Sequence, residues 1–302
     1  MTKEKKHQPL FTVFTGTYNR GKLLYRVYNS LLAQELKNFE WLIVDDGSTD
    51  DTRQVVGKMI EEGLLRIRYF YKENGGVHSA HNIAIEKAEG FFFARCDSDD
   101  EFLPHTLCSA FSIWGSIQEE KRSMYSGILF LNEDDEGNVI GDKFPKDEAE
   151  YSWRILSEIS GDKMRVYRTD ILRIFPFPVF KGEKLVPESL VWGRIHEVYK
   201  MRCVNLSVMR VHRGEGDRLS WQVRKFRYKY PNGYAIYYLE EMKRPHSIIR
   251  NMELSINYIR VMLGMKVGFL DIFRGNPKKV LSIFLIPIGF IFYKIDKIRG
   301  FV

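Results

Sequence analysis

The sequence predicts an α/β protein in which helices flank a mostly parallel central sheet, with a helical extension at the C-terminal end. Three observations lead to this prediction. Through the first hundred residues, short strand-like runs alternate with runs of helical periodicity. Clusters of polar residues directly follow three of the strand-like runs, and the segments from Trp221 onward are helical in character. Alternation of strands and helices is typical of a parallel sheet with helices on its faces.

The first four predicted strands span residues 10–15, 39–44, 65–71 and 91–96. The first helix between them carries Leu23, Leu24, Val27 and Leu31 on one face, and two further helices span residues 52–62 and 77–88. Gly90 follows the third helix and favours its end. Because parallel strands align their carboxyl ends, we expect the polar residues after these strands to share one edge of the sheet, where open α/β sheets bind ligands.

The pattern after Leu103 is less regular. Two strand-like runs, 124–131 and 139–141, flank an acidic turn and predict a hairpin, followed by a helix at 187–199 and a strand at 201–211. The C-terminal helices are expected to break near Pro245, residues 275–277 and Pro287. We therefore predict a domain at residues 1–220, with halves at 1–104 and 105–220, and a helical region at residues 221–302.

Composition restricts the class of protein. The 302 residues are 44% hydrophobic and 28% charged, which excludes a disordered or low-complexity chain. Three cysteines without a CxxC pair exclude a disulfide scaffold and a zinc knuckle, and they favour a reducing compartment. The first eight residues are polar and basic, and no secretory apolar segment follows them. We therefore expect a cytoplasmic protein.

Charge is unevenly distributed along the chain. The 81 residues from Gln222 onward carry 15 Lys and Arg against 5 Asp and Glu, whereas the first 221 residues have a net charge of −3. The longest uncharged apolar run, residues 280–293, is shorter than the roughly 20 residues that span a bilayer. Basic residues border it on both sides: Lys278, Lys279, Lys294, Lys297 and Arg299. We expect docking on the inner face of the cell membrane rather than nucleic-acid binding, with a buried core helix as the alternative.

Four acids stand within five residues at Asp97, Asp99, Asp100 and Glu101. Like charges this close repel one another unless a cation shares them. Carboxylate oxygens suit Mg²⁺ or Mn²⁺, which commonly lies between protein carboxylates and substrate phosphates. The alternative is a solvated acidic loop that caps the helix beginning near Pro104. The position directly after an apolar strand, beside two other polar strand ends, favours the metal site.

The second strand ends in two adjacent acids, Asp45 and Asp46. The residues after them form a turn and a helix cap, which accounts for Gly47 to Asp51 but not for the second acid. A carboxylate at this point could accept hydrogen bonds from a nucleobase N–H or a ribose hydroxyl. Tyr18, after the first strand, could stack on a planar base, although packing is the simpler role for such a residue.

Four motifs therefore follow one another in the first 104 residues: Thr17-Tyr18-Asn19, Val44 to Asp50, Asn74-Gly75-Gly76 with Asn82, and Asp97-Ser98-Asp99-Asp100. In order and spacing this set closely resembles glycosyltransferase family 2. A weaker likeness continues through Gly161-Asp162-Lys163 and Pro187-Glu188-Ser189 and fades after about residue 220. The resemblance implies the GT-A fold and the transfer of a sugar from a nucleotide sugar, usually a UDP-sugar, with inversion at the anomeric carbon.

The resemblance also implies residue roles. The nucleotide-sugar site would contain Thr17, Tyr18, Asn19, Asp46, Asn82, Asp97 and Ser98, with Thr17, Tyr18 and Asp46 at the uracil and Asp97 near the ribose. Asp99 would hold the metal, joined by His212 as in some GT-A enzymes, and Gly161 and Asp162 would bind the acceptor. A lone histidine such as His212 is more often a loop or core residue. Many relatives have arginine where His81 stands, so the nucleotide contact made through that arginine is not implied here.

Inverting transfer needs a base that takes the proton of the acceptor hydroxyl. Relatives place an acid pair at the start of a helix in the second half, and the matching residue is Glu188. Ser189 fills the second position of that pair, and Glu183 is the nearest substitute. The alternative is that Glu188 is an ordinary first-turn acid, favoured by the helix dipole.

We therefore expect a metal-dependent glycosyltransferase that acts on a saccharide acceptor. The basic, apolar C-terminal region suggests a lipid-linked acceptor, as in bacterial surface polysaccharide assembly, an inference by analogy. Two alternatives remain. One is a nucleotidyltransferase that forms sugar nucleotides, which would need a glycine-rich basic loop after the first strand. The other is a membrane-docked scaffold without turnover, against which the intact acids Asp97, Asp99 and Glu188 count.

Overall fold

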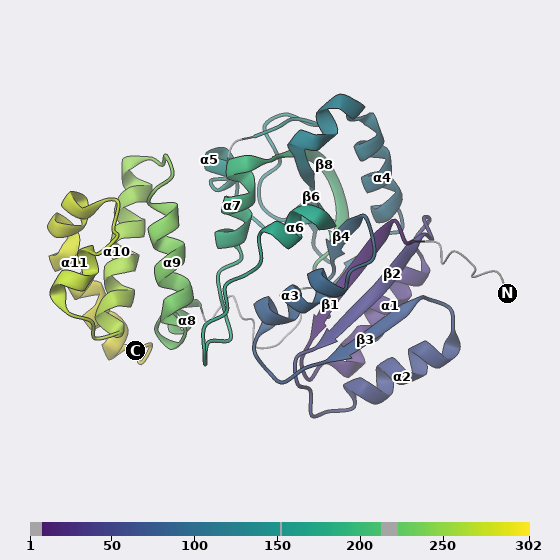
Figure 1. Cartoon of the computed structure of the whole chain (residues 1–302), viewed down its shortest axis with the longest axis horizontal. Helices are drawn as coiled ribbons and strands as arrows, with labels where there is room; N and C mark the ends of the chain where they lie inside the picture. Colours follow the sequence, from purple (N-terminus) through teal and green to yellow (C-terminus); the bar gives the residue numbers. More distant parts are fainter. Residues whose placement is uncertain (1–7, 152, 213–222) are drawn as a thin grey trace. The chain divides into compact units, whose positions relative to one another are not determined.

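The computed structural model describes residues 8–151, 153–212 and 223–302 (Figure 1). The chain divides into two compact units. The first comprises Met1–Pro176 and Ile195–Gly214, and the second comprises Phe177–Arg194 and Glu215–Val302. Residues 177–194, which we had grouped with the sheet domain, thus belong to the unit that contains the C-terminal helices.

The first unit is built on an eight-stranded sheet of order β3-β2-β1-β4-β7-β6-β8-β5. The strands are β1 (Phe11–Thr17), β2 (Phe39–Asp45), β3 (Ile67–Tyr71), β4 (Phe92–Arg95), β5 (Glu101–Phe102), β6 (Tyr125–Glu133), β7 (Lys163–Arg168) and β8 (Lys200–Arg210). The first four pair in parallel, whereas β7 runs antiparallel to β4 and β6, and β5 runs antiparallel to β8. The predicted α/β class is confirmed, with a parallel first half and a mixed second half.

Helices connect the strands of this unit (Figure 1). They are α1 (Leu24–Leu32), α2 (Thr52–Glu62), α3 (Val77–Lys87), α4 (Thr106–Ser116), α5 (Trp153–Leu156) and α6 (Thr169–Ile174), with 3-10 turns at Gly21–Leu23 and Glu119–Met124. The bounds of α2 are those predicted, since Gly63 adopts the left-handed conformation that ends a helix. The first four predicted strands all form, with ends shifted by one or two residues.

The two faces of the parallel half carry different helices. Phe11, Val13, Trp41 and Ile43 share one buried apolar cluster with residues of α1, α2 and α4. Phe14 points to the other face, because successive side chains of a strand alternate, and its ring packs edge-on against His81 of α3. Both faces of the sheet are therefore covered, as the near-continuous apolar composition of β1 and β2 requires.

The predicted hairpin is reduced to its turn, where the Asp134 amide donates to the Asn138 carbonyl and the Ile140 amide donates to the Asn132 carbonyl, each at 2.9 Å. Val139 meets Glu133 in a single bridge, and β6 pairs instead with β7 and β8. All nine residues of β6 are buried, so the strand lies inside the sheet rather than at a hairpin edge. Sequence reasoning missed β7, a strand of six residues of which three, Lys163, Arg165 and Arg168, are charged.

The second unit is helical. It contains α8 (Val223–Lys229), α9 (Pro231–Glu241), α10 (Ile248–Gly264) and α11 (Lys279–Ile298), with a 3-10 turn at Phe269–Phe273, while α7 (Ser189–Val198) begins in it and ends in the first unit. Chain breaks fall near Pro245 and residues 275–277 as predicted, but α11 continues through Pro287. Pro287 lies on the exposed side of α11, where water can bond the carbonyl that the proline leaves without a donor. Within the described ranges, every helix falls short of the length and apolarity that crossing a membrane requires.

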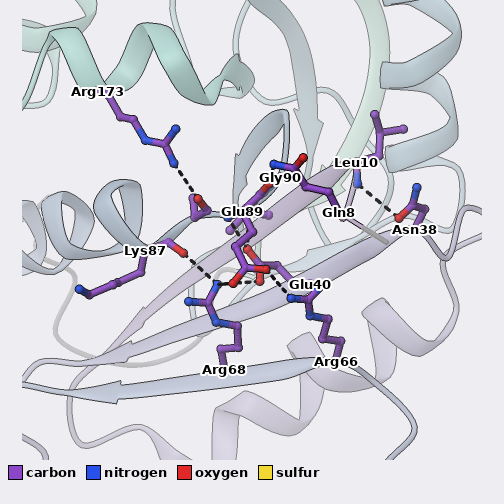
Figure 2. Close-up of polar contacts among 12 residues, drawn as sticks. Gln8, Leu10, Asn38, Glu40, Arg66, Arg68, Lys87, Glu89, Gly90 and Arg173 are labelled. Carbon is purple, nitrogen blue, oxygen red and sulfur yellow. Dashed lines mark hydrogen bonds and ion pairs between the residues drawn. The ribbon is translucent and has the colours of Figure 1, made fainter. Parts of the chain in front are cut away.

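A buried carboxylate joins the amino ends of the parallel strands (Figure 2). The side chain of Glu40 on β2 is fully buried. Its Oε1 accepts hydrogen bonds from Thr12 Oγ1 of β1 at 2.6 Å and from the Glu89 amide before β4 at 2.8 Å, and Arg68 of β3 donates to Oε2 at 2.9 Å. One carboxylate thus ties together all four strands of the parallel half, opposite the edge where the motifs lie.

We predict that Glu40→Ala lowers the free energy of unfolding by about 2–4 kcal/mol, because it leaves the Thr12 hydroxyl and the Glu89 amide without their acceptor and removes one of the two ion pairs of Arg68. Urea unfolding followed by circular dichroism measures the change. Glu61→Ala, at an exposed position of α2, is the control and should stay within about 0.5 kcal/mol of the parent. Equal stability of the two variants would contradict a structural role for Glu40.

Candidate active site

Three predicted polar clusters meet at one edge of the sheet. Thr17 and Asp45 are register partners at the ends of β1 and β2. The amide of Asp46 donates to the Thr17 carbonyl at 2.8 Å, and the amide of Cys96, just before Asp97, donates to the Phe14 carbonyl at 2.9 Å. The expectation that these clusters share one edge is therefore confirmed.

The loop after β1 is tied to the loop after β2. Asn19 adopts a left-handed conformation with φ of 53°, which asparagine tolerates better than most residues. Its amide donates to Ser48 Oγ at 2.8 Å, and its Oδ1 accepts from the Thr49 amide at 2.7 Å. Asn19, which we expected at the nucleotide, is therefore used to hold the two loops together.

Thr17 and Tyr18 differ in exposure. The Oγ1 atom of Thr17 is buried and has no hydrogen-bond partner among the residues that the structure describes. Tyr18, the next residue, has about half of its surface (49%) exposed. A buried hydroxyl without a partner normally costs free energy, so this strand end is a place where a polar ligand atom would be stabilised.

Asp45 and Asp46 are both buried and both hydrogen-bonded. Asp45 accepts from the Ser48 amide at 2.7 Å and from the Tyr69 hydroxyl at 2.6 Å. Burial, followed by the hydrogen bond to Asp45, raises the pKa of Tyr69. This tyrosine therefore remains a neutral donor to the carboxylate.

The carboxylate of Asp46 holds the glycine-containing loop before α3. Its Oδ1 accepts from Lys72 Nζ at 2.6 Å and from the Gly75 amide at 2.9 Å, and its Oδ2 accepts from the Gly76 amide at 2.7 Å. Any contact of Asp46 with a nucleobase would come in addition to these three bonds. The second acid at the strand end thus has a structural use that sequence reasoning did not foresee.

Arginines surround the acidic motif after β4. Arg20 pairs with Asp99 Oδ2 at 2.9 Å and also donates to Ser98 Oγ at 3.3 Å. Arg95 pairs with Asp97 at 2.5 Å, and Arg26 donates to the Asp99 carbonyl at 2.5 Å. Sequence reasoning missed all three arginines, although Arg20 directly follows the first motif.

The two outer acids remain accessible. The side chains of Asp97 and Asp99 are 44% and 39% exposed, whereas Ser98 and Asp100 are buried. Burial, with the neighbouring charges of Asp97 and Asp99, raises the pKa of Asp100 to about 8. A cation beside the exposed Asp97 and Asp99 would relieve the repulsion among these carboxylates.

His212 lies beside the motif and is held by acids. Its amide donates to Asp100 at 3.3 Å, its Nδ1 lies 2.5 Å from Asp135, and its Nε2 lies 3.5 Å from Glu101. Arg210, opposite Glu101 in the β5–β8 pair, bonds both Glu101 and Glu133.

No set of three or more His, Cys, Asp or Glu side chains in the described part of the chain is arranged to hold a metal. The donors still fit a hard divalent cation, because the Asp97 and Asp99 oxygens are exposed and substrate phosphates complete such sites.

The remaining predicted residues lie on separate elements. Asn82 is on α3, and Gly161 and Asp162 are exposed directly before β7. His81, at the position where many relatives have arginine, is buried against Phe14 and Phe93 and therefore acts as a packing residue.

The two candidate bases belong to the second unit. Glu188 is partly buried just before α7, and its carbonyl accepts from the amides of Val191 and Trp192. Glu183 is buried, and its carboxylate accepts from Asn232 Nδ2 at 2.7 Å and from the amides of Asn232 and Gly233 at 2.8 and 3.0 Å. It therefore caps the amino end of α9.

The family model described as "Glycosyl transferase family 2" matches residues 12–175. A Rickettsia felis protein named as an uncharacterized glycosyltransferase is 34% identical over 140 residues, which are 46% of this chain and 22% of that protein. Escherichia coli chondroitin synthase is 31% identical over 157 residues, 50% of this chain and 21% of that protein. The chain spans between about a fifth and two-fifths of the length of the first curated relatives that it matches.

Solved structures share the fold over almost the whole chain. Residues 1–349 of Staphylococcus aureus TarS in complex with UDP-GlcNAc align with a TM-score of 0.65 and 20% identity, covering 96% of this chain and 92% of that one. The mannosyltransferase PcManGT of Pyrobaculum calidifontis, in complex with GDP-Man and Mn²⁺, aligns with a TM-score of 0.57 and 16% identity, covering 97% and 88%.

The loop after β2 contacts the loop after β3 at Gly47, whose φ is 88°. A Cβ atom there would lie 2.8 Å from the Asn74 amide nitrogen. We predict that Gly47→Ala lowers the free energy of unfolding by about 1–3 kcal/mol. Gly57→Ala is the control, because its Cβ enters open space within α2, and it should stabilise the protein by about 0.5–1 kcal/mol. Chemical denaturation measures the stability of both variants. The prediction is wrong if Gly47→Ala is as stable as Gly57→Ala.

Proposed function

The chain belongs to glycosyltransferase family 2, and we propose that it transfers a sugar from a UDP-sugar to a hydroxyl group of a saccharide acceptor, with inversion at the anomeric carbon. One observation carries this proposal: two accessible carboxylates, Asp97 and Asp99, share a sheet edge with the exposed ring of Tyr18 and with the buried hydroxyl of Thr17, which has no hydrogen-bond partner among the described residues. Acids suited to a diphosphate-bound cation thus lie beside groups suited to a nucleoside.

The donor site is proposed on the first unit. The Tyr18 ring is exposed enough to stack on a base, and the Thr17 hydroxyl can satisfy its hydrogen bond with a base atom. Asp46 would complete the uracil contacts, and Asp97 would accept a hydrogen bond from the ribose. Ser98 and Asn82 would line the remainder of the donor site. The complexes of TarS with UDP-GlcNAc and of PcManGT with GDP-Man support a nucleotide-sugar donor.

Asp99, with Asp97 beside it, would hold a Mn²⁺ or Mg²⁺ ion, and His212 would be an additional ligand. A cation bound there would neutralise charge on the departing diphosphate. Arg95 and Arg20 hold the two carboxylates in place, and both acidic side chains remain 44% and 39% exposed to a ligand. The mannosyltransferase complex with Mn²⁺ supports a divalent cation at this fold.

Glu188 is proposed as the base that removes the proton of the acceptor hydroxyl. The contacts of Glu183 support this choice, because its carboxylate accepts three hydrogen bonds at the start of α9 and is thereby committed to the fold. Gly161 and Asp162 are proposed to contact the acceptor.

The acceptor is proposed to be lipid-linked, with the enzyme at the cytoplasmic face of the membrane. The exposed apolar side chains of α11 support this location. A panel of nucleotide sugars, each with Mn²⁺, tests the proposed activity through nucleotide release and thermal stabilisation. Failure of every nucleotide sugar to bind would favour the scaffold alternative.

We predict that Asp99→Asn removes most transferase activity and most of the stabilisation by UDP with Mn²⁺, because the amide is a poorer cation ligand. Activity of the parent should disappear in EDTA and return with Mn²⁺. Glu119→Gln, an exposed acid-to-amide change, should behave as the parent. Full turnover by Asp99→Asn, or by the parent in EDTA, would contradict the assignment of Asp99 as a metal ligand.

We predict that Glu188→Gln lowers kcat about 10²–10⁴-fold, since the amide cannot take the proton. UDP-sugar affinity should barely change. Glu183→Gln should instead lower stability by about 1–3 kcal/mol and leave the kcat of the folded enzyme near that of the parent. The base assignment is wrong if Glu183→Gln is inactive while folded and Glu188→Gln remains active.

A further inference from the structure

The helix α11 is attached to the second unit through one face. Ser282, Leu285, Gly289 and Asp296 are its buried residues, spaced three, four and seven apart as one side of a helix requires. Gly289 permits close approach, because a Cβ atom there would lie 2.6 Å from Ile259 Cγ2 of α10. Its position relative to α10 is therefore well defined.

A polar contact near the carboxyl end fixes α11 as well. Asp296 accepts from Tyr228 of α8 at 2.5 Å and from Arg260 Nε of α10 at 3.0 Å. Its negative charge is thereby neutralised inside the unit. Asp296 is also the one acidic residue in the α11 sequence.

The opposite face of α11 is apolar and exposed. We call Val280, Ile283, Phe284, Ile288, Ile291 and Ile298 the α11 apolar face. Phe284 and Ile298 have 74% and 86% of their surface exposed. A surface helix of a soluble protein normally presents polar side chains on this side. Contiguous exposed apolar surface of this kind marks an interaction site.

Basic residues lie at both ends of the same helix. Lys278 and Lys279 stand at its amino end, and Lys294, Lys297 and Arg299 at its carboxyl end. With about 1.5 Å per residue, the two basic groups lie roughly 25 Å apart. A shallow hollow of about 700 Å³ at the amino end is lined by both lysines together with Val280, Leu281 and Phe284. A lining that combines lysines with apolar residues suits a phosphate that carries acyl chains.

We propose that α11 docks the protein on an anionic lipid bilayer, lying in the plane of the interface with its apolar face toward the acyl chains. The basic ends would contact headgroup phosphates, as amphipathic interfacial helices do. A second copy of this chain fits less well, because the α11 apolar faces of two copies would bring their basic ends together. The proposal does not depend on the transferase activity.

Co-sedimentation of the full chain with vesicles tests the proposal. We expect binding to phosphatidylcholine vesicles that contain 30% phosphatidylglycerol, weaker binding at high salt, and little binding to phosphatidylcholine alone. The double variant Phe284→Ser, Ile291→Ser should bind at least tenfold more weakly. Phe111→Ser, Ile60→Ser is the matched control, because both residues are exposed on helices of the first unit and should not affect binding.

A charge variant tests the same surface without changing its apolar area. Lys278→Glu, Lys279→Glu should lose at least tenfold in affinity for anionic vesicles, whereas Lys58→Glu, Lys121→Glu, with the same change in net charge, should lose far less. Absence of binding by the parent, or equal losses in both charge variants, would overturn the proposal. A dimer in light scattering that Phe284→Ser, Ile291→Ser disperses would assign the face to self-association instead.

Thermal stabilisation by UDP with Mn²⁺, measured on the same samples, separates this proposal from the proposed function. A variant that loses vesicle binding but keeps nucleotide stabilisation identifies a docking defect in a folded protein. If the parent protein binds vesicles but no nucleotide sugar, the docking proposal is supported and the transferase proposal is refuted.

Discussion

The in-register parallel pairing of β1 with β2 and β4 is the constraint on which the candidate site depends. It brings Thr17 opposite Asp45 and places the acidic motif beside them. The pairing is held at both ends of the strands. Glu40 ties the amino ends through Thr12, Arg68 and the Glu89 amide, while Asp46 ties the carboxyl edge to the loop before α3. Buried, fully bonded carboxylates are costly to misplace, which gives the edge a single geometry.

Acidic and basic side chains are interleaved at that edge. Arg20 and Arg95 pair with the two outer acids, and the pKa of Asp100 is raised first by its burial and then by the neighbouring charges of Asp97 and Asp99. The side chains of Asp97 and Asp99 stay exposed despite these ion pairs, so a cation can reach both carboxylates. The arginines thus preserve the arrangement of the acids without filling the site.

In the second unit, the main feature is a helix that is packed on one side and exposed on the other. Its helix α11 is fixed by Gly289 and Asp296 on one side and leaves large apolar residues exposed on the other. The sequence offered a core helix or an interfacial helix as alternatives for residues 280–293. The structure shows that one helix has both a packed and an exposed face, because its apolar residues surround it nearly completely while α10 can cover only one side.

Sequence alone determined the first four strands, the helices between them and the shared edge of their motifs, because period-2 and period-3.6 patterns and loop residues are local signals. It did not determine the strand order beyond β4, the burial of His81, or the use of Asp46 and Glu183 as structural acceptors. Those depend on contacts between residues far apart in the chain, such as Lys72 with Asp46, Asn232 with Glu183 and Phe92 with Arg168. The sequence of a motif is the same whether its carboxylate binds a ligand or a backbone amide. Only the tertiary structure shows which donors surround the carboxylate.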